Sequence, residues 1–235
     1  MRGIIMSSNL AIFTLLAIAT LASKSASAAP IAKNLMSRVP VIQKIEQDNP
    51  QLSPRVLFAG LRAYDHLRTK GLDNRHLLTI VDFNRPSNKR RLWILNVKNG
   101  DTQYFTYVAQ GQNTGTNVAK HFSNKIGSHE SSIGVYLTGQ IYYGIDGQSM
   151  RIYGLDDGFN SNVYQRDVVM HPAWYVSHSF AKKYKRIGNT YGCFGLNEKL
   201  APKIIPEIEG GTVMVAYYPN NQWLATSPYE RLMLT

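Results

Sequence analysis

Cysteine is nearly absent from this sequence: Cys193 is the only one among 235 residues. A single thiol cannot be half of an internal disulfide. It is then a reactive group, a site of intermolecular linkage, or an inert small hydrophobe in the core. The surrounding sequence, YGCFGLN, places Gly192 directly before the cysteine in a flexible turn.

Acidic residues are scarce as well, with 15 Asp and Glu against 26 Lys and Arg and a formal net charge of +11 at pH 7. Such an excess favours an anionic partner, and the candidates are a carboxylate-rich wall polymer, a membrane surface and nucleic acid. The alternative is a basic surface that serves solubility and has no partner. Nucleic acid agrees least with the export signal described next.

Long hydrophobic runs are also missing. The longest is the thirteen-residue run from Leu10 to Ala22, and a membrane helix needs roughly 20 apolar residues. This run follows Arg2 and precedes a small-residue stretch that ends in an A-x-A pattern at Ala28. These features predict a secretory signal peptide over 1–28 and an exported protein without a membrane span, with an uncleaved anchor as the alternative.

Two helices are expected before residue 77. Leu57, Leu61 and Tyr64 recur at spacings of three and four residues, which is the period of a helix with one apolar face. A Ser-Pro pair before them and a glycine after them are start and stop signals. The pattern predicts a helix over about 54–70, and prolines delimit a shorter one over about 41–48.

From residue 77 the pattern changes to short runs rich in β-branched and aromatic residues. An Asn-Gly pair between the second and third runs indicates a hairpin. We therefore expect a mainly β fold with flanking helices, comprising a helical segment at 29–76 and a mostly antiparallel β domain at 77–235. The predicted strands are LLTIVDF, RLWILNV, TQYFTYVAQ, IGVYLTG, MRIYGL, DVVMH and TVMVAYY.

A reactive Cys193 requires a base, because a thiol attacks acyl carbonyls as the thiolate. Among six histidines, His171 stands apart because it ends the apolar run DVVM, where a sheet commonly displays functional side chains. Pro172 follows it and is expected to prevent a simple continuation of the strand. Gly192 would let amide N–H groups at 192 and 193 point at an oxyanion. The alternatives are a hydrogen-bonded core histidine and an ordinary turn glycine.

Four separated stretches closely resemble one known family: FSNKIGSHESSIGVYLTG, YYGIDGQSMRIYGLDDGFN, DVVMHPAWYVS and RIGNTYGCFGLN. The family is the YkuD-like L,D-transpeptidase catalytic domain, and more narrowly the murein L,D-transpeptidase catalytic-domain family. The similarity runs from about Leu77 to Tyr218. It implies that Cys193 is the nucleophile and that His171, within hydrogen-bond reach, is its base.

Further residues are candidates for substrate binding. In this family the strand that SSIGVYLTG resembles lines the site, which implies wall positions at Ser131, Ser132 and Gly134. Arg186, in the basic run KKYKR, could attract substrate carboxylates or belong to an ordinary solvated helix end. Tyr175 could form an aromatic wall for a peptide or pack in the core.

The segment around the cysteine departs from the family in part. Thr190 matches the hydroxyl residue that many members carry three positions before the cysteine. Tyr191 stands where the wider fold often has histidine. Phe194-Gly195 stands where the wider fold commonly has an arginine for a substrate carboxylate and the narrower family usually has Pro-Ala. We include Thr190 and Tyr191 among the candidate binding residues.

The resemblance implies a reaction on peptidoglycan stem peptides, in the periplasm or cell wall, that needs no metal or other cofactor. The thiolate attacks the carbonyl of the third stem residue, terminal D-alanine leaves, and an amine resolves the thioester into a 3→3 cross-link. The acceptor amine could belong to another stem or to a protein. With water as acceptor, the same site is an L,D-carboxypeptidase.

A backbone carbonyl or a hydroxyl such as Ser177 should orient His171.

Other function classes stay open. An inactive wall-binding protein would fit the charge and the residues after Cys193, and it predicts a buried thiol or a distant His171. A cysteine peptidase of another fold is disfavoured, because papain-like enzymes usually place the nucleophile before the histidine and here His171 comes 22 positions earlier. The histidines lack a short ligand spacing, which disfavours a zinc peptidase.

Overall fold

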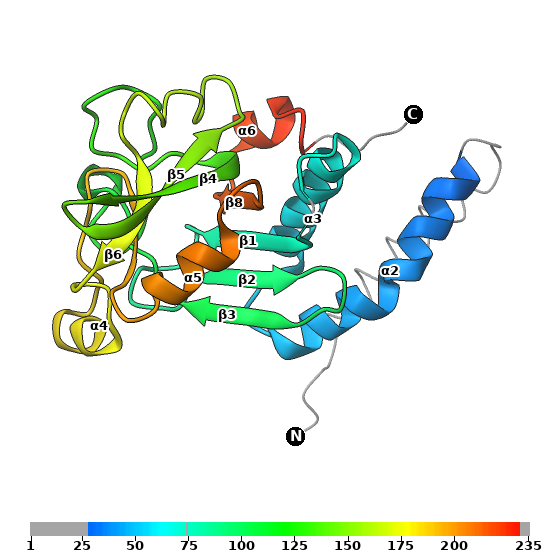
Figure 1. Ribbon diagram of the computed structural model, residues 1–235, viewed down its shortest axis with the longest axis horizontal. Coiled ribbons are helices and arrows are strands. Elements are labelled where there is room, and N and C mark those ends of the chain that lie inside the picture. Colours follow the sequence, from blue (N-terminus) through cyan, green and yellow to red (C-terminus); the bar gives the residue numbers. More distant parts are fainter. Residues whose placement is uncertain (1–27, 74, 231–235) are drawn as a thin grey trace.

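The computed structural model describes residues 28–73 and 75–230 (Figure 1). The expected signal peptide lies outside these residues, apart from Ala28. Across the described ranges, no helix combines the length and the apolar character needed to cross a membrane.

The described residues form one eight-stranded sheet with the strand order β3-β2-β1-β8-β4-β5-β6-β7. Neighbouring strands are antiparallel, except for the parallel pairs β1–β8 and β6–β7. The predicted mainly β fold with flanking helices is confirmed. The strands are β1 (Leu77–Asp82), β2 (Leu92–Asn96), β3 (Thr102–Thr106), β4 (Gly134–Gly144), β5 (Gly147–Gly154), β6 (Val169–Ala173), β7 (Phe194–Asn197) and β8 (Val213–Tyr217).

Helices pack against this sheet at several places (Figure 1). α3 contacts β1 and β8, and α5 contacts β4, β5 and β6. A single 3-10 turn, η1, follows the third strand. The helical elements are α2 (Ala28–Asp48), α3 (Pro54–Thr69), η1 (Gln112–Thr114), α4 (His178–Tyr184), α5 (Ala201–Ile208) and α6 (Asn221–Thr226).

The two predicted helices differ in how well their bounds agree with the structure. α3 coincides with the expected helix, and its apolar residues Leu57, Leu61 and Tyr64 are buried. The shorter expected helix is the end of α2, which begins earlier and contains Pro40. Proline removes one backbone N–H and strains the preceding turn, but here it does not end the helix.

Two departures from the predicted strands lie close to the cysteine. β6 continues through Pro172, so the expected break at this proline is wrong. β6 pairs with β5 only at Val169 and Met170, and beyond them its partner is β7 alone. A strand with one free side accommodates a residue that lacks an N–H. No sequence pattern predicts β7, because its residues FGLN are few and include a glycine.

The β6–β7 pair separates two environments. Met170, Phe194 and Leu196 are fully buried in the main hydrophobic core. Ala173 belongs to a second, smaller apolar cluster on the other side of β6, together with Ala109 and neighbouring residues. Because successive strand residues point to opposite faces, the residues between the core positions face away from the main core.

Candidate active site

Strands β6 and β7 place the two candidate catalytic residues on one face of the sheet. Their parallel register pairs Met170 with Phe194 and His171 with Gly195. Cys193 lies two positions before Gly195, so it projects to the same side as His171 from the neighbouring strand. The local alternation of the two strands therefore brings the only thiol and this imidazole to a common surface.

That surface is hollowed into a cavity of about 360 Å³. Five of the sequence-predicted residues line it, and the sequence patterns indicated none of the other three. The predicted residues are Cys193, His171, Thr190, Tyr191 and Tyr175, and the others are Gln112, Asp146 and Asn189.

The turn before the nucleophile depends on Gly192. Its φ of +120° lies in a region that favours glycine, and an added Cβ would lie 2.8 Å from the Glu130 carbonyl oxygen. The Gly192 N–H donates to Thr190 Oγ1 at 3.2 Å, and Thr190 Oγ1 donates to the Cys193 carbonyl oxygen at 2.8 Å. Thr190 thus fastens both sides of the turn that presents the sulfur.

The Cys193 thiol is half-buried and free. Its Sγ donates to the Asp167 carbonyl oxygen at 3.6 Å, and no hydrogen bond within the described residues joins it to His171. Burial raises the pKa of this thiol; a hydrogen bond from the Val169 backbone lowers it, and the carboxylate of Asp146 raises it further. The resting sulfur is therefore a protonated thiol near neutral pH, and its activation requires a base.

His171 is held by a backbone carbonyl. The ring is buried, and Nδ1 lies 2.8 Å from the Pro172 carbonyl oxygen. A carbonyl only accepts hydrogen bonds, so Nδ1 carries the proton and Nε2 is left as the basic nitrogen. Ser177, the other expected orienting group, instead caps α4 by accepting from the Phe180 N–H at 3.2 Å.

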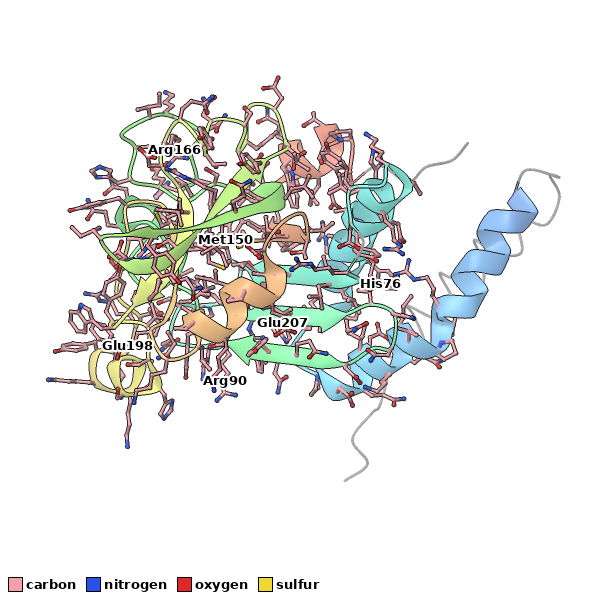
Figure 2. All side chains as sticks on the ribbon, in the orientation of Figure 1. His76, Arg90, Met150, Arg166, Glu198 and Glu207 are labelled. Atoms are coloured by element: carbon pink, nitrogen blue, oxygen red, sulfur yellow. The ribbon has the colours of Figure 1, made fainter. Side chains whose placement is uncertain are left out.

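A half-buried arginine that the sequence patterns did not indicate lies behind the nucleophile turn. Arg166 lies among the loops that flank β5 and β6 (Figure 2), and its Nη2 would be 3.3 Å from a Cβ on Gly192. It donates to the carbonyl oxygens of Ser123 and Glu130 at 2.6 Å each and to the hydroxyls of Ser132 and Ser128 at 2.6 and 3.0 Å. Its positive charge lowers the pKa of the nearby thiol, against the effect of burial.

The predicted wall residues lie behind the cavity rather than along it. Ser131 accepts from the Gly111 N–H at 2.9 Å, and its hydroxyl reaches the Gly192 carbonyl at 3.4 Å. Ser132 accepts from Arg166, as described above. Gly134 has a φ of +128° and no room for a side chain. Ser131 thus contacts the nucleophile turn and Ser132 contacts Arg166, whereas the side chains of Asn160 and Asp156 fill the space beside Gly134. None of the three lines the cavity.

Arg186 is also outside the set of cavity-lining residues. Its guanidinium donates to the Ile187 carbonyl oxygen and to Asn189 Oδ1, both at 3.1 Å. Asn189 does line the cavity, so Arg186 reaches the site only through this amide. The exposed lysines of α4, Lys182 and Lys183, lie nearby in sequence.

Asp146 is the second functional candidate that sequence reasoning missed. It lies at the tip of the β4–β5 hairpin, with Oδ2 3.5 Å from His171 Nδ1, and its side chain is about half exposed. An Asp-Gly pair in YYGIDGQ signals a turn, but nothing local indicates that this turn reaches His171. Asp146 reaches the cavity because the β4–β5 hairpin is long enough to extend along β6 as far as His171.

One family profile and several solved structures are similar to this chain. The profile of the L,D-transpeptidase catalytic domain matches residues 48–217. No curated protein sequence matches significantly.

The similar solved structures are distant. An L,D-transpeptidase from Mycobacterium smegmatis is 11% identical, with 61% of this chain and 59% of that chain covered and a TM-score of 0.37. L,D-transpeptidase 1 from Mycobacterium tuberculosis is 11% identical, with 61% of this chain and 62% of that chain covered and a TM-score of 0.35. The helical cell shape determining protein Pgp2 from Campylobacter jejuni is 10% identical, with 68% of this chain and 57% of that chain covered and a TM-score of 0.39. This chain thus spans about three fifths of the length of these proteins.

Proposed function

Because this chain belongs to the L,D-transpeptidase catalytic-domain family, we propose that it is an exported, cysteine-dependent L,D-transpeptidase that acts on peptidoglycan stem peptides. The observation that carries the proposal is a single cavity lined by both Cys193 and His171. An inactive wall-binding protein predicts a buried thiol or a distant histidine, whereas here a half-buried thiol and the histidine border the same cavity. Export is inferred from the signal-like sequence at 1–28, and it would place the enzyme in the periplasm or cell wall.

In the first half reaction, His171 acts as the general base. Its Nε2 takes the proton of the Cys193 thiol, while Nδ1–H stays bonded to the Pro172 carbonyl and keeps the ring oriented. The thiolate attacks the carbonyl of the third residue of a stem tetrapeptide. The C–S bond forms, the C–N bond to D-alanine breaks, and the proton on Nε2 passes to the leaving amine.

The oxyanion of this step needs amide donors near the sulfur. The Gly192 N–H is already engaged by the Thr190 hydroxyl. We therefore assign the stabilising role to the Cys193 N–H, in the turn whose shape Gly192 permits.

In the second half reaction, an amine of another stem peptide resolves the thioester into a 3→3 cross-link. The exposed Lys182 and Lys183 on α4, with Arg186 beside them, would attract the carboxylates of stem peptides to this end of the molecule. The aromatic side chains Tyr175 and Tyr191 would form walls of the peptide site.

The test is intact-mass measurement after incubation with a purified disaccharide tetrapeptide. We expect an adduct equal to the substrate minus D-alanine, located on Cys193, and its complete loss in Cys193→Ser, because a hydroxyl in a site that relies on a thiolate is a far poorer nucleophile. A cross-linked dimer among the products identifies a transpeptidase, whereas a tripeptide alone identifies an L,D-carboxypeptidase. A wild-type protein that forms no adduct and turns over no tetrapeptide would refute the proposal in favour of a wall-binding role.

A further inference from the structure

The closed end of the β4–β5 hairpin brings a carboxylate to the cavity. Gly144 pairs with Gly147, which leaves Ile145 and Asp146 as the two residues of the turn. Because β5 is hydrogen-bonded to β6, the β4–β5 hairpin runs beside β6 (Figure 1). Asp146 at its end comes within 3.5 Å of the His171 ring. Asp146 lines the cavity, whereas Ile145 is fully exposed to solvent.

The charged side chain that lines the cavity is acidic. Asp146 is its acidic side chain, and no lysine or arginine is among the described residues that line it. Burial favours the neutral forms of Cys193 and Tyr175, and it raises the pKa of Tyr175 to about 12. Arg166 and Arg186 direct their N–H groups to protein acceptors. A negative cavity without a lining cation favours a cationic guest over a carboxylate.

We propose that Asp146 is a specificity-determining residue that binds the ammonium group of the acceptor and thereby directs the thioester toward a primary amine rather than water. This inference rests on the proposed function and names the chemical class of the second substrate. The Asp146 carboxylate is half-exposed, so it can accept charge-assisted hydrogen bonds from an ammonium at the cavity mouth. Its Oδ2 lies 3.5 Å from His171 Nδ1, in the same imidazole ring as Nε2, the nitrogen that must deprotonate the amine.

Formation of the amide removes two protons from the acceptor ammonium. The bound ammonium gives one proton to His171 Nε2, which is free again once D-alanine has left. The amine nitrogen attacks the thioester carbonyl, the C–N bond forms and the C–S bond breaks. The Cys193 thiolate takes the proton back from the imidazolium, and the second proton lost by the nitrogen goes to solvent. The products are the amide cross-link and the free thiol.

The experiment measures how one thioester divides between two fates. Wild type, Asp146→Asn and Asp157→Asn receive the disaccharide tetrapeptide with rising amounts of a stem tripeptide, which carries the acceptor amine but has no D-alanine to lose. The ratio of cross-linked to hydrolysed product does not depend on the acylation rate, because both products come from the same thioester. Asp157 is the matched control, since it is an exposed aspartate that does not line the cavity.

We expect the ratio at a given tripeptide concentration to fall roughly tenfold in Asp146→Asn, the size of one charge-assisted hydrogen bond at a partly exposed site. It should stay at the wild-type value in Asp157→Asn. Asp146→Glu, which keeps the carboxylate, should recover part of the loss.

A neutral nucleophile separates charge recognition from a general defect. Hydroxylamine is uncharged near neutral pH, so its competition with water should be the same in wild type and Asp146→Asn. An equal fall with hydroxylamine and tripeptide, or no fall with tripeptide, would overturn the inference and leave the proposed function standing. A wild-type protein that forms no thioester would overturn both.

Discussion

The β6–β7 pair has two faces with different tasks. On one face, Met170, Phe194 and Leu196 are fully buried in the main core. On the other, His171 and Cys193 border the cavity. The two sets alternate along the same short segments, so a register shift of one residue would exchange core positions and catalytic positions. Packing on the core face therefore maintains the geometry on which the cavity face depends.

Substitutions on the cavity face should change rates and leave the free energy of unfolding nearly unchanged, whereas substitutions on the core face should do the reverse. Apart from the loss of Cys193 itself, four changes test how completely the two faces are separated.

The largest effect is expected from His171→Ala. Loss of the general base should slow thioester formation by about 10²–10⁴-fold. The free energy of unfolding should fall by only about 1 kcal/mol, because one hydrogen bond, to the Pro172 carbonyl, is removed. Time-resolved intact mass and denaturant unfolding measure the two quantities.

The pH dependence of His171→Ala sharpens this prediction. Burial raises the pKa of Cys193, so without the base the thiolate fraction is small at neutral pH and grows as the pH rises toward and past this raised value. The residual rate of the variant should increase with pH across the alkaline range. A variant that acylates at the wild-type rate near neutral pH would show that another group activates the thiol.

The next effect is expected on the core face, from Leu196→Ala. Removing a fully buried leucine side chain should lower the free energy of unfolding by about 2–5 kcal/mol. The acylation rate per folded molecule should stay near wild type. Met170→Leu conserves volume on the same face and should cost less than about 1.5 kcal/mol. If Leu196→Ala abolished acylation in protein that is still folded, the two faces would not be separable.

Gly192→Ala should affect both quantities, because this residue shapes the turn between the faces. The positive φ and the close Glu130 carbonyl should together cost about 1–3 kcal/mol of stability. Acylation should slow as well, since the turn that presents Cys193 must shift. Gly158→Ala is the matched control: its φ is +76°, but no atom lies within 4 Å of an added Cβ. The control should lose stability through backbone strain and keep its acylation rate.

The smallest effect is expected from Tyr191→Ala. This side chain is 67% exposed and lines the cavity, so its loss should change stability by less than about 0.5 kcal/mol. Loss of an aromatic contact should raise the KM for the stem peptide roughly two- to tenfold. Tyr184→Ala, an exposed tyrosine on α4 that does not line the cavity, should leave KM unchanged. Equal changes in both variants would mean that Tyr191 does not contact substrate.

Local sequence patterns predicted those helices and strands whose apolar residues recur at the spacing, or cluster in the runs, typical of that element. The helical spacing of Leu57, Leu61 and Tyr64 predicted α3 with its buried face. The predicted β runs correspond to seven of the eight strands. The exception, β7, has a glycine among its four residues, and it is a strand because β6 offers it a parallel partner.

The sequence by itself determined which groups are available for chemistry: one cysteine after a turn glycine, and a histidine at the end of an apolar run, both within motifs that resemble one family. Only the tertiary structure decided what surrounds them. Asp146 reaches the cavity because the β4–β5 hairpin runs beside β6. Arg166 lies behind Gly192 because its guanidinium donates hydrogen bonds to the Ser123 and Glu130 carbonyls, in a loop distant in the sequence. Such contacts depend on strand register and on the lengths of intervening loops, and these are set by packing between distant segments rather than by any local pattern.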